Sequence, residues 1–89
     1  MARAAARVLS EIGLHPSLIV LGVTTAEGVE EEISLDRRSF SAADGGIDIG
    51  WPVGQREDGA LLVEFPQETS RGAWRLWVPA ASVSGLAHP

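Results

Sequence analysis

The sequence predicts a mainly β protein, a small five-stranded barrel preceded by an N-terminal α-helix. Three observations support this prediction. The segment from Ala2 to Ile12 has apolar residues at helical spacing, later segments alternate between apolar and polar residues, and short loops containing glycine connect several of them. At 89 residues the chain forms one domain. We expect a helical segment over residues 1–14 and the barrel over residues 17–89.

The expected helix has one apolar face, and its members stand at i, i+3, i+4 and i+7: Ala5, Val8, Leu9 and Ile12. Gly13 suits the left-handed position that ends a helix. Pro16 prevents the helix from resuming. The alanine-rich face buries little area, so this helix would be stable only when docked.

Two strands, "SLIVLGVTT" and "VEEEISLD", are expected around a three-residue loop, with Gly28 in the left-handed position. This loop pairs Ile19 with Leu35, Leu21 with Ile33, and Val23 with Glu31. The apolar residues of both strands then share one face. Glu30, Glu32 and Asp36 project together from the other face.

Three more strands are expected in "GIDIGWPVGQ", "ALLVEFP" and "AWRLWVP", the first two joined by the turn "EDG". The registers pair Val53 with Val63, Trp51 with Phe65, Phe65 with Trp74, Val63 with Leu76, and Leu61 with Val78. The apolar residues of all three strands then face inward, Ile47 and Ile49 included. We therefore expect Trp51, Phe65 and Trp74 to be buried together, and Trp74→Ala to cost about 3–5 kcal/mol.

Trp77 follows Trp74 by three residues, so strand alternation places it on the opposite, outward face. The expected register sets Leu62 beside Trp77 and Glu64 beside Arg75, with Pro52 and two glycines on the next strand. An outward tryptophan with an arginine is typical of a binding surface. The cover of Trp77 stays open among the N-terminal helix, a second copy of the chain and a partner protein.

Two segments resemble parts of Src-homology-3 domains. "WVPAASVSGL" resembles their end, where an aliphatic–proline pair, a short 3₁₀ turn and a valine lead into the last strand. "EEEISLDRRSF" resembles the acidic segment that closes their first long loop. The resemblance implies a Src-homology-3-like barrel that serves as an interaction module, as do some acidic bacterial antirepressors. The chain has none of the tyrosines of that family's peptide groove, and Ser82 stands at the position of the tyrosine in the terminal turn.

The composition excludes several kinds of catalysis. The chain has no cysteine, lysine or tyrosine, so thiolate, Schiff-base and phenol chemistry are ruled out. His15 precedes a proline and His88 is penultimate, and neither is expected to be a catalytic base. Asp44 and Asp48 supply too few oxygen ligands for a calcium loop. We expect no enzyme activity, no cofactor and no metal.

The net charge of −5 disfavours direct nucleic-acid binding and favours a basic or arginine-rich protein partner. The run Glu30, Glu31, Glu32 is either a solvated strand face or an anionic binding surface, to which Asp36 would contribute. No window is apolar enough to span a membrane. The lack of cysteine fits the cytoplasm, and the use of arginine alone as cation fits a GC-rich bacterial genome. A homodimer stays open.

The sequence thus predicts a non-enzymatic protein–protein interaction module, an adaptor or an acidic regulator that occupies a basic surface of its partner. The candidate binding residues are Leu62, Glu64, Arg75, Trp77, Pro52, Glu30, Glu31, Glu32 and Asp36. The alternative is an accessory or subunit-like domain of an enzyme system, with a small-ligand pocket and no catalytic group of its own.

Overall fold

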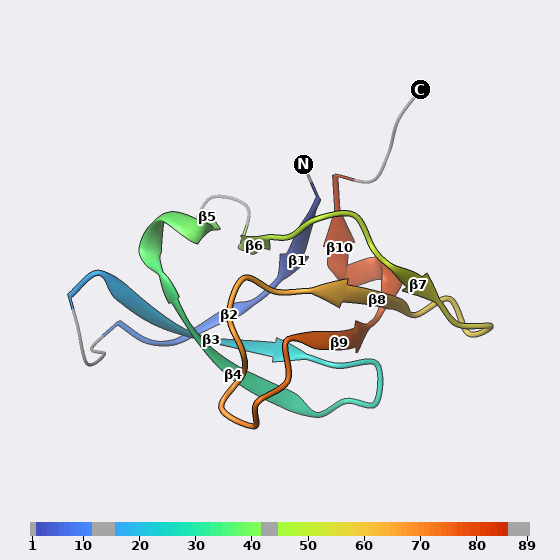
Figure 1. Cartoon of the computed structure of the whole chain (residues 1–89), viewed down its shortest axis with the longest axis horizontal. Helices are drawn as coiled ribbons and strands as arrows, with labels where there is room; N and C mark the ends of the chain where they lie inside the picture. Colours follow the sequence, from blue (N-terminus) through green and yellow to red (C-terminus); the bar gives the residue numbers. More distant parts are fainter. Residues whose placement is uncertain (1, 12–15, 42–44, 86–89) are drawn as a thin grey trace.

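The computed structural model describes residues 2–11, 16–41 and 45–85, and these residues form three small antiparallel sheets (Figure 1). The elements are β1 (Arg3–Ala5), β2 (Arg7–Ser10), β3 (Leu18–Thr24), β4 (Glu30–Asp36), the 3₁₀ turn η1 (Arg37–Ser39), β5 (Phe40–Ser41), β6 (Gly46–Asp48), β7 (Gly54–Gln55), β8 (Leu61–Glu64), β9 (Arg75–Val78), the 3₁₀ turn η2 (Ala80–Ser82) and β10 (Val83–Ser84). The sheets have the orders β10-β1-β6-β5, β2-β3-β4 and β7-β8-β9. The protein is mainly β, but the expected closed barrel is wrong, because these sheets stay separate.

The expected N-terminal α-helix is also wrong, and no α-helix occurs among the described residues. β1 is an inner strand instead, with Ala4 opposite both Ile47 of β6 and Val83 of β10. The side chain of Ala4 is fully buried, whereas Val8, expected to face the core, is 43% exposed. Alanine has a high helix propensity, but this preference amounts to only a few tenths of a kcal/mol per residue. Burial of Ala4 between two strands outweighs it. Ile12 and Gly13 of the expected helix lie outside the described residues.

The hairpin of β3 and β4 has the predicted register, with Ile19 opposite Leu35, Leu21 opposite Ile33 and Val23 opposite Glu31. Gly28 adopts a positive φ of 83°, as the predicted three-residue loop requires. The Thr25 amide donates to the Val29 carbonyl at 2.8 Å and closes the loop. The inward apolar residues of both strands are buried, so the alternation in the sequence was sufficient to define this hairpin.

The predicted register between β8 and β9 is confirmed too, since Leu61 lies opposite Val78 and Val63 opposite Leu76. The predicted pairs of Val53 with Val63 and of Trp51 with Phe65 do not form, and Val53, expected to face inward, is exposed. On the other side Gly54 pairs with Leu62, and Gly59 in the connecting turn has a positive φ of 89°. Phe65, Val63, Leu76 and Val78 are buried as predicted, and so are Ile47 and Ile49.

The predicted burial of Trp51 and Trp74 is wrong: they are 60% and 46% exposed. The Val53 amide donates to the carbonyl of Leu62, and Leu62 is also the residue that pairs with Gly54. Two residues therefore oppose one, as in a β-bulge, and the alternation of this segment is broken ahead of β7. Trp74 lies in a bend before β9 begins at Arg75, so strand alternation does not extend to its side chain.

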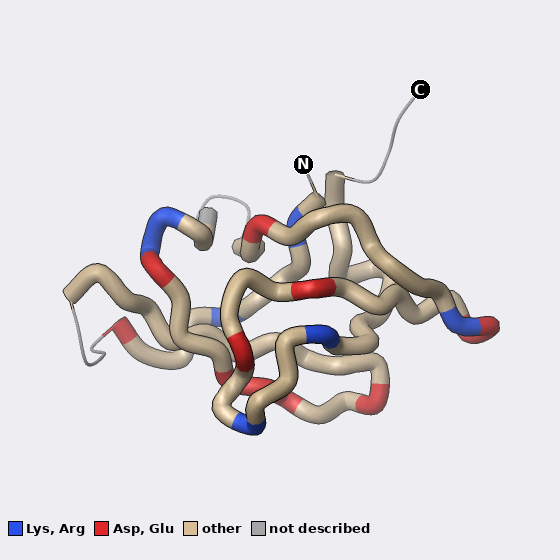
Figure 2. The backbone as a smooth tube through the Cα atoms, viewed as in Figure 1, with Lys and Arg blue, Asp and Glu red and all other residues tan. Residues whose placement is uncertain are grey.

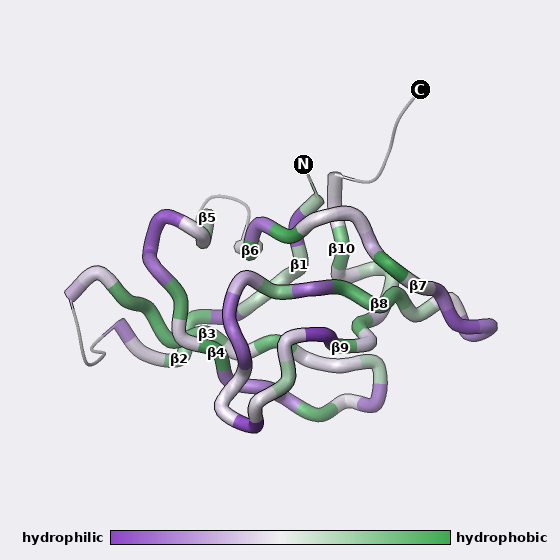
Figure 3. The backbone as a smooth tube through the Cα atoms, viewed as in Figure 1, coloured by the Kyte–Doolittle hydropathy of each residue, from purple (hydrophilic) through white to green (hydrophobic). Residues whose placement is uncertain are grey.

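All three sheets contribute to one hydrophobic cluster. The buried residues of this cluster are Ala2, Ala4, Ile19, Leu21, Val23, Ile33, Leu35, Ile47, Ile49, Val63, Phe65, Leu76 and Val78. A strongly hydrophilic segment forms the turn between β7 and β8, which projects from one end of the molecule (Figure 3). The core therefore holds the sheets together although they do not close into a barrel.

Two connections adjoin the sheet β7-β8-β9. The β8–β9 loop runs along β4, where Thr69 bridges to Ile33 and the Ser70 amide donates to the Glu32 carbonyl at 2.8 Å. The 3₁₀ turn expected after Val78 and Pro79 is present as η2 and leads into β10. The β8–β9 loop thereby covers part of the outer edge of β4.

Candidate functional site

The candidate site is the outer face of sheet β7-β8-β9, which we define by Leu62, Glu64, Arg75 and Trp77. Strand alternation places these four side chains on the face opposite Val63, Leu76 and Val78. Leu62 is the ladder partner of Trp77, and Glu64 that of Arg75. Arg75 Nε lies 2.7 Å from Glu64 Oε2. The structure therefore brings together four of the residues that the sequence analysis selected.

Trp77 is half-buried and is covered by its own chain. A Cβ on Gly54 would stand 3.5 Å from Trp77 Cη2, so the absent side chain at Gly54 leaves room for the ring. From the other direction the guanidinium carbon of Arg56 lies 5.2 Å from the ring centroid. Neither a helix nor a second chain is needed to cover Trp77. Pro52, also selected from the sequence, is partly buried in the segment before β7.

Arg56 is held over Trp77 by two carboxylates from different turns. Its guanidinium lies 2.7 Å from Glu27 of the β3–β4 turn and 2.7 Å from Asp58 of the β7–β8 turn. The hydrogen bond from Arg56 and a second one from the Ala60 amide lower the pKa of Asp58. The hydrogen bonds that Arg56 donates to Asp58 and, second, to Glu27 raise the pKa of Arg56. The arrangement connects two turns across the edge of the outer face.

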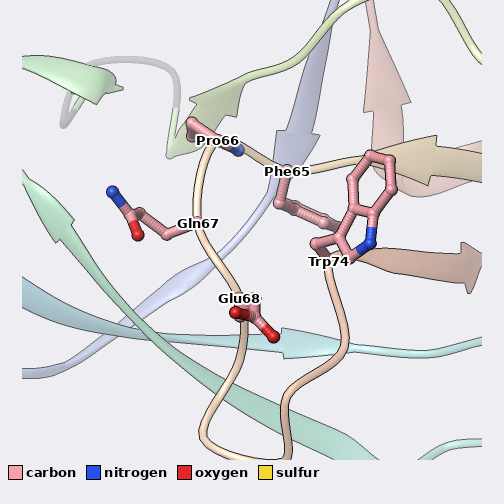
Figure 4. Close-up of a pocket in the computed structure, with 5 residues that line it drawn as sticks. All are labelled: Phe65, Pro66, Gln67, Glu68 and Trp74. Atoms are coloured by element: carbon pink, nitrogen blue, oxygen red, sulfur yellow. The ribbon is translucent and has the colours of Figure 1, made fainter.

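Trp74 is the residue of this region that sequence reasoning misplaced. The guanidinium carbon of Arg75 lies 4.6 Å from the Trp74 ring centroid, so Arg75 contacts both Trp74 and Glu64. Trp74 also lines an open hollow of about 440 Å³, which we call the Trp74 hollow (Figure 4). Its other lining residues are Phe65, Pro66, Gln67 and Glu68. A second hollow of about 360 Å³ shares Phe65 and Pro66 with it and extends to Gly50, next to Trp51.

The position of Glu68 gives the Trp74 hollow a charged wall. Figure 4 shows Gln67 directed away from Trp74, and Glu68 between the two arms of the β8–β9 loop. Glu68 Oε2 lies 3.6 Å from the point where a Cβ on Gly72 would stand. One feature of the sequence could have indicated this site. Gly72 and Ala73 directly precede Trp74, so Trp74 lies close to the loop, where the alternation of the following strand need not apply.

The acidic residues selected on β4 do not form one surface. Glu30 pairs with Arg7 through two contacts of 2.9 and 3.0 Å. It reaches Arg7 across Gly22, where a Cβ would stand only 2.6 Å from Glu30 Oε2. Asp36 accepts hydrogen bonds from the side chain and the amide of Arg38, which lower its pKa to about 2. Glu32 is exposed.

Glu31 faces inward, as its predicted pairing with Val23 requires, and it is 8% exposed. Its Oε2 lies 3.7 Å from Arg71 Nη1, while its Oε1 has no hydrogen-bond partner among the described residues. Arg71 belongs to the loop that runs along β4, so this contact lies between β4 and that loop. A buried carboxylate oxygen without a donor destabilises the folded state.

Each of the seven arginines forms an ion pair with an acidic residue of the same chain. Figure 2 shows the resulting interleaving of basic and acidic segments. Among the described residues, Glu32, Glu57 and Glu68 have no such pair. The negative charge that the chain does not neutralise internally is thus carried partly by the wall of the Trp74 hollow.

The described part of the chain contains no group of three or more potential metal-ligating side chains. Asp48 pairs with Arg3 at 2.8 Å, whereas His15, Asp44 and His88 lie outside the described residues. Within residues 2–11, 16–41 and 45–85, no helix has the length and apolar character needed to cross a membrane.

No family model, no curated protein and no solved structure matches this chain.

Proposed function

We propose that this protein is a non-enzymatic protein–protein interaction module that binds its partner through the Trp74 hollow and the adjoining outer face. The observation that carries the proposal is the exposure of Trp74 beside an open hollow. Removing a tryptophan ring from water takes about 150–250 Å² of surface out of contact with solvent. Trp74 still exposes 46% of its surface, so a partner that covers it would bury roughly half of this area.

The composition of the region supports the same function. Tryptophan and arginine are the residue types most enriched among those that dominate binding energy at interfaces. Here Trp74, Arg75 and the exposed Trp51 lie close to two hollows that share a floor at Phe65 and Pro66. The hollows are open and shallow, which suits a segment of a protein better than an enclosed small molecule. The module acts in the cytoplasm as an adaptor or acidic regulator, and its net charge of −5 favours a basic partner.

The test uses the purified full-length chain as bait in an extract of its native cells. Wild-type protein, Trp74→Ser and a control, Val29→Ser, are compared. Val29 is 40% exposed in the β3–β4 turn and outside both hollows, so its replacement removes exposed apolar surface elsewhere. We expect one partner to be retained by wild type and Val29→Ser but lost by Trp74→Ser.

The captured protein is then purified and its affinity for the three variants is measured by calorimetry. Loss of a residue that dominates binding should weaken affinity at least about 30-fold, corresponding to 2 kcal/mol or more. A partner that binds Trp74→Ser as tightly as wild type would contradict the proposal. Circular dichroism of each variant establishes that the fold is retained.

A further inference from the structure

We propose that the Trp74 hollow receives the positively charged side chain of an arginine or lysine from the partner. This inference rests on the proposed function and specifies which group enters the hollow. Its starting point is the wall chemistry, since an aromatic ring at Trp74, apolar groups at Phe65 and Pro66, and a carboxylate at Glu68 line one space (Figure 4).

The charge distribution selects a cation as the occupant. All seven arginines are already engaged with carboxylates of their own chain, whereas Glu68 has no ion pair with any described residue. A neutral group that filled the hollow could at most donate hydrogen bonds to Glu68, and it would remove water from a carboxylate whose charge it leaves uncompensated, which is unfavourable. An anion would be repelled by Glu68 and by the net charge of −5. A guanidinium or ammonium group alone compensates the carboxylate.

The aromatic wall favours the same occupant. A cation placed over a tryptophan face is attracted by the negative potential of the ring, and the methylene groups of arginine and lysine pack on apolar surface. Arg75 already contacts the Trp74 ring, at 4.6 Å, and shows that this ring accepts a guanidinium. The charge of Arg75 is neutralised by Glu64 at 2.7 Å, so it repels an incoming cation only weakly.

The experiment uses three synthetic peptides that differ at one position, acetyl-Gly-Ser-X-Ser-Gly-amide with arginine, lysine or citrulline at X. Citrulline has nearly the shape of arginine and no charge. Each peptide is titrated into isotopically labelled full-length protein, and the amide and indole N–H signals are followed by nuclear magnetic resonance. The indole signal of Trp74 is identified by its absence in Trp74→Phe.

We expect the arginine and lysine peptides to shift the Trp74 indole and the amides of residues 65–68, and the citrulline peptide to bind at least about fivefold more weakly, which is the effect of one exposed charge contact. Glu68→Gln should reduce the affinity for arginine peptide about fivefold. The control Glu57→Gln makes the same change in net charge on the β7–β8 turn, away from the hollow, and should change it less than twofold.

Three outcomes would overturn the inference: equal binding of the arginine and citrulline peptides, equal loss in Glu68→Gln and Glu57→Gln, or shifts that map outside the hollow. Its failure is distinguishable from failure of the proposed function. A native partner that requires Trp74 but presents a neutral group there would contradict only this inference. A hollow that binds the arginine peptide, in a protein for which no native partner depends on Trp74, would contradict only the proposed function.

Discussion

The three tryptophans have three different surroundings. Trp51 precedes the bulge ahead of β7 and is exposed, Trp74 lies in the bend before β9 and is about half exposed, and Trp77 lies in β9 beneath Arg56. None of them is part of the buried cluster, whose largest fully buried side chains include Leu21 and Ile33. The buried cluster therefore consists mainly of aliphatic residues, and the tryptophan side chains contribute to the surface.

This difference predicts opposite responses to truncation at Trp74 and Leu21. Leu21→Ala leaves a cavity in a fully buried site and should lower the free energy of unfolding by about 2–5 kcal/mol. Trp74→Ala removes a half-exposed ring and should lower it by about 1 kcal/mol or less. Urea unfolding of both variants measures the difference. A larger loss for Trp74→Ala than for Leu21→Ala would show that Trp74 belongs to the core.

Glu31 offers a second residue-level prediction. Glu31→Met has a similar length and removes a buried carboxylate oxygen that lacks a donor among the described residues. Because replacing buried charge by apolar groups is often stabilising, the free energy of unfolding should rise by about 1–2 kcal/mol. Arg71→Met serves as the control, since it removes the cation and leaves the carboxylate buried, and it should be destabilising. A loss of stability in Glu31→Met would contradict this account.

Asp36 predicts a pH dependence with a definite sign. Hydrogen bonds from Arg38 hold its folded-state pKa at about 2, below the ordinary value of 3.8, so folding favours the ionised form. The stability contributed by this carboxylate is present above about pH 4 and is lost as the pH falls towards 2. The difference in stability between wild type and Asp36→Asn should shrink over that interval. A carboxyl carbon titration of Asp36 with a midpoint near 3.8 would contradict the prediction. Arg38→Gln removes the side-chain donors and keeps the backbone amide donor, so it should raise the midpoint only part of the way towards 3.8.

At the scale of elements, the N-terminal strand is integral to the fold rather than an appended cover. β1 lies between β6 and β10, so the first described residues pair with a strand near the middle of the chain and with the last strand. A helix over the same residues would place Ala5 against the core, whereas the strand places Ala4 there and leaves Ala5 exposed. Substitutions at Ala4 and at Ala5 therefore distinguish the strand from the helix, because each arrangement buries a different one of the two.

The corresponding experiment compares Ala4→Leu with Ala5→Leu. Ala4 is fully buried between two strands, so a larger side chain should overpack the site and cost about 1–3 kcal/mol. Ala5→Leu places the same side chain in solvent and should change stability by less than about 0.5 kcal/mol. Thermal unfolding measures both. The reverse order would support a helix in this segment.

At the scale of the whole molecule, three separate sheets share one buried cluster, so they should unfold together. The chain offers a direct measurement, because all three tryptophans lie in or next to sheet β7-β8-β9. Tryptophan fluorescence reports on that region, whereas far-ultraviolet circular dichroism reports on all the strands. The two signals should give the same midpoint in urea. Separate midpoints would show that the sheets unfold independently.

The sequence by itself determined the strands and registers that depend on local alternation and turn chemistry. The loops ending at Gly28 and Gly59 require a left-handed residue, and each determines which residues of the flanking strands face each other. The same alternation indicated the buried residues of β3, β4, β8 and β9, and the outward position of Trp77. These features follow from neighbours along the chain, so a single sequence contains enough information for them.

Only the tertiary structure decided the state of the N-terminus, the exposure of Trp51 and Trp74, and the ion pairs between distant segments, such as those of Arg3 with Asp48 and of Arg56 with Glu27. Alanine-rich residues 2–6 suit a helix locally, but Ala4 is buried between strands more than 40 residues later in the chain. The bulge at Val53 depends on a hydrogen bond to β8, and the Trp74 hollow depends on how the β8–β9 loop lies along β4. Each is a contact between segments distant in sequence, whose free energy exceeds local preference and leaves no periodic pattern in the sequence.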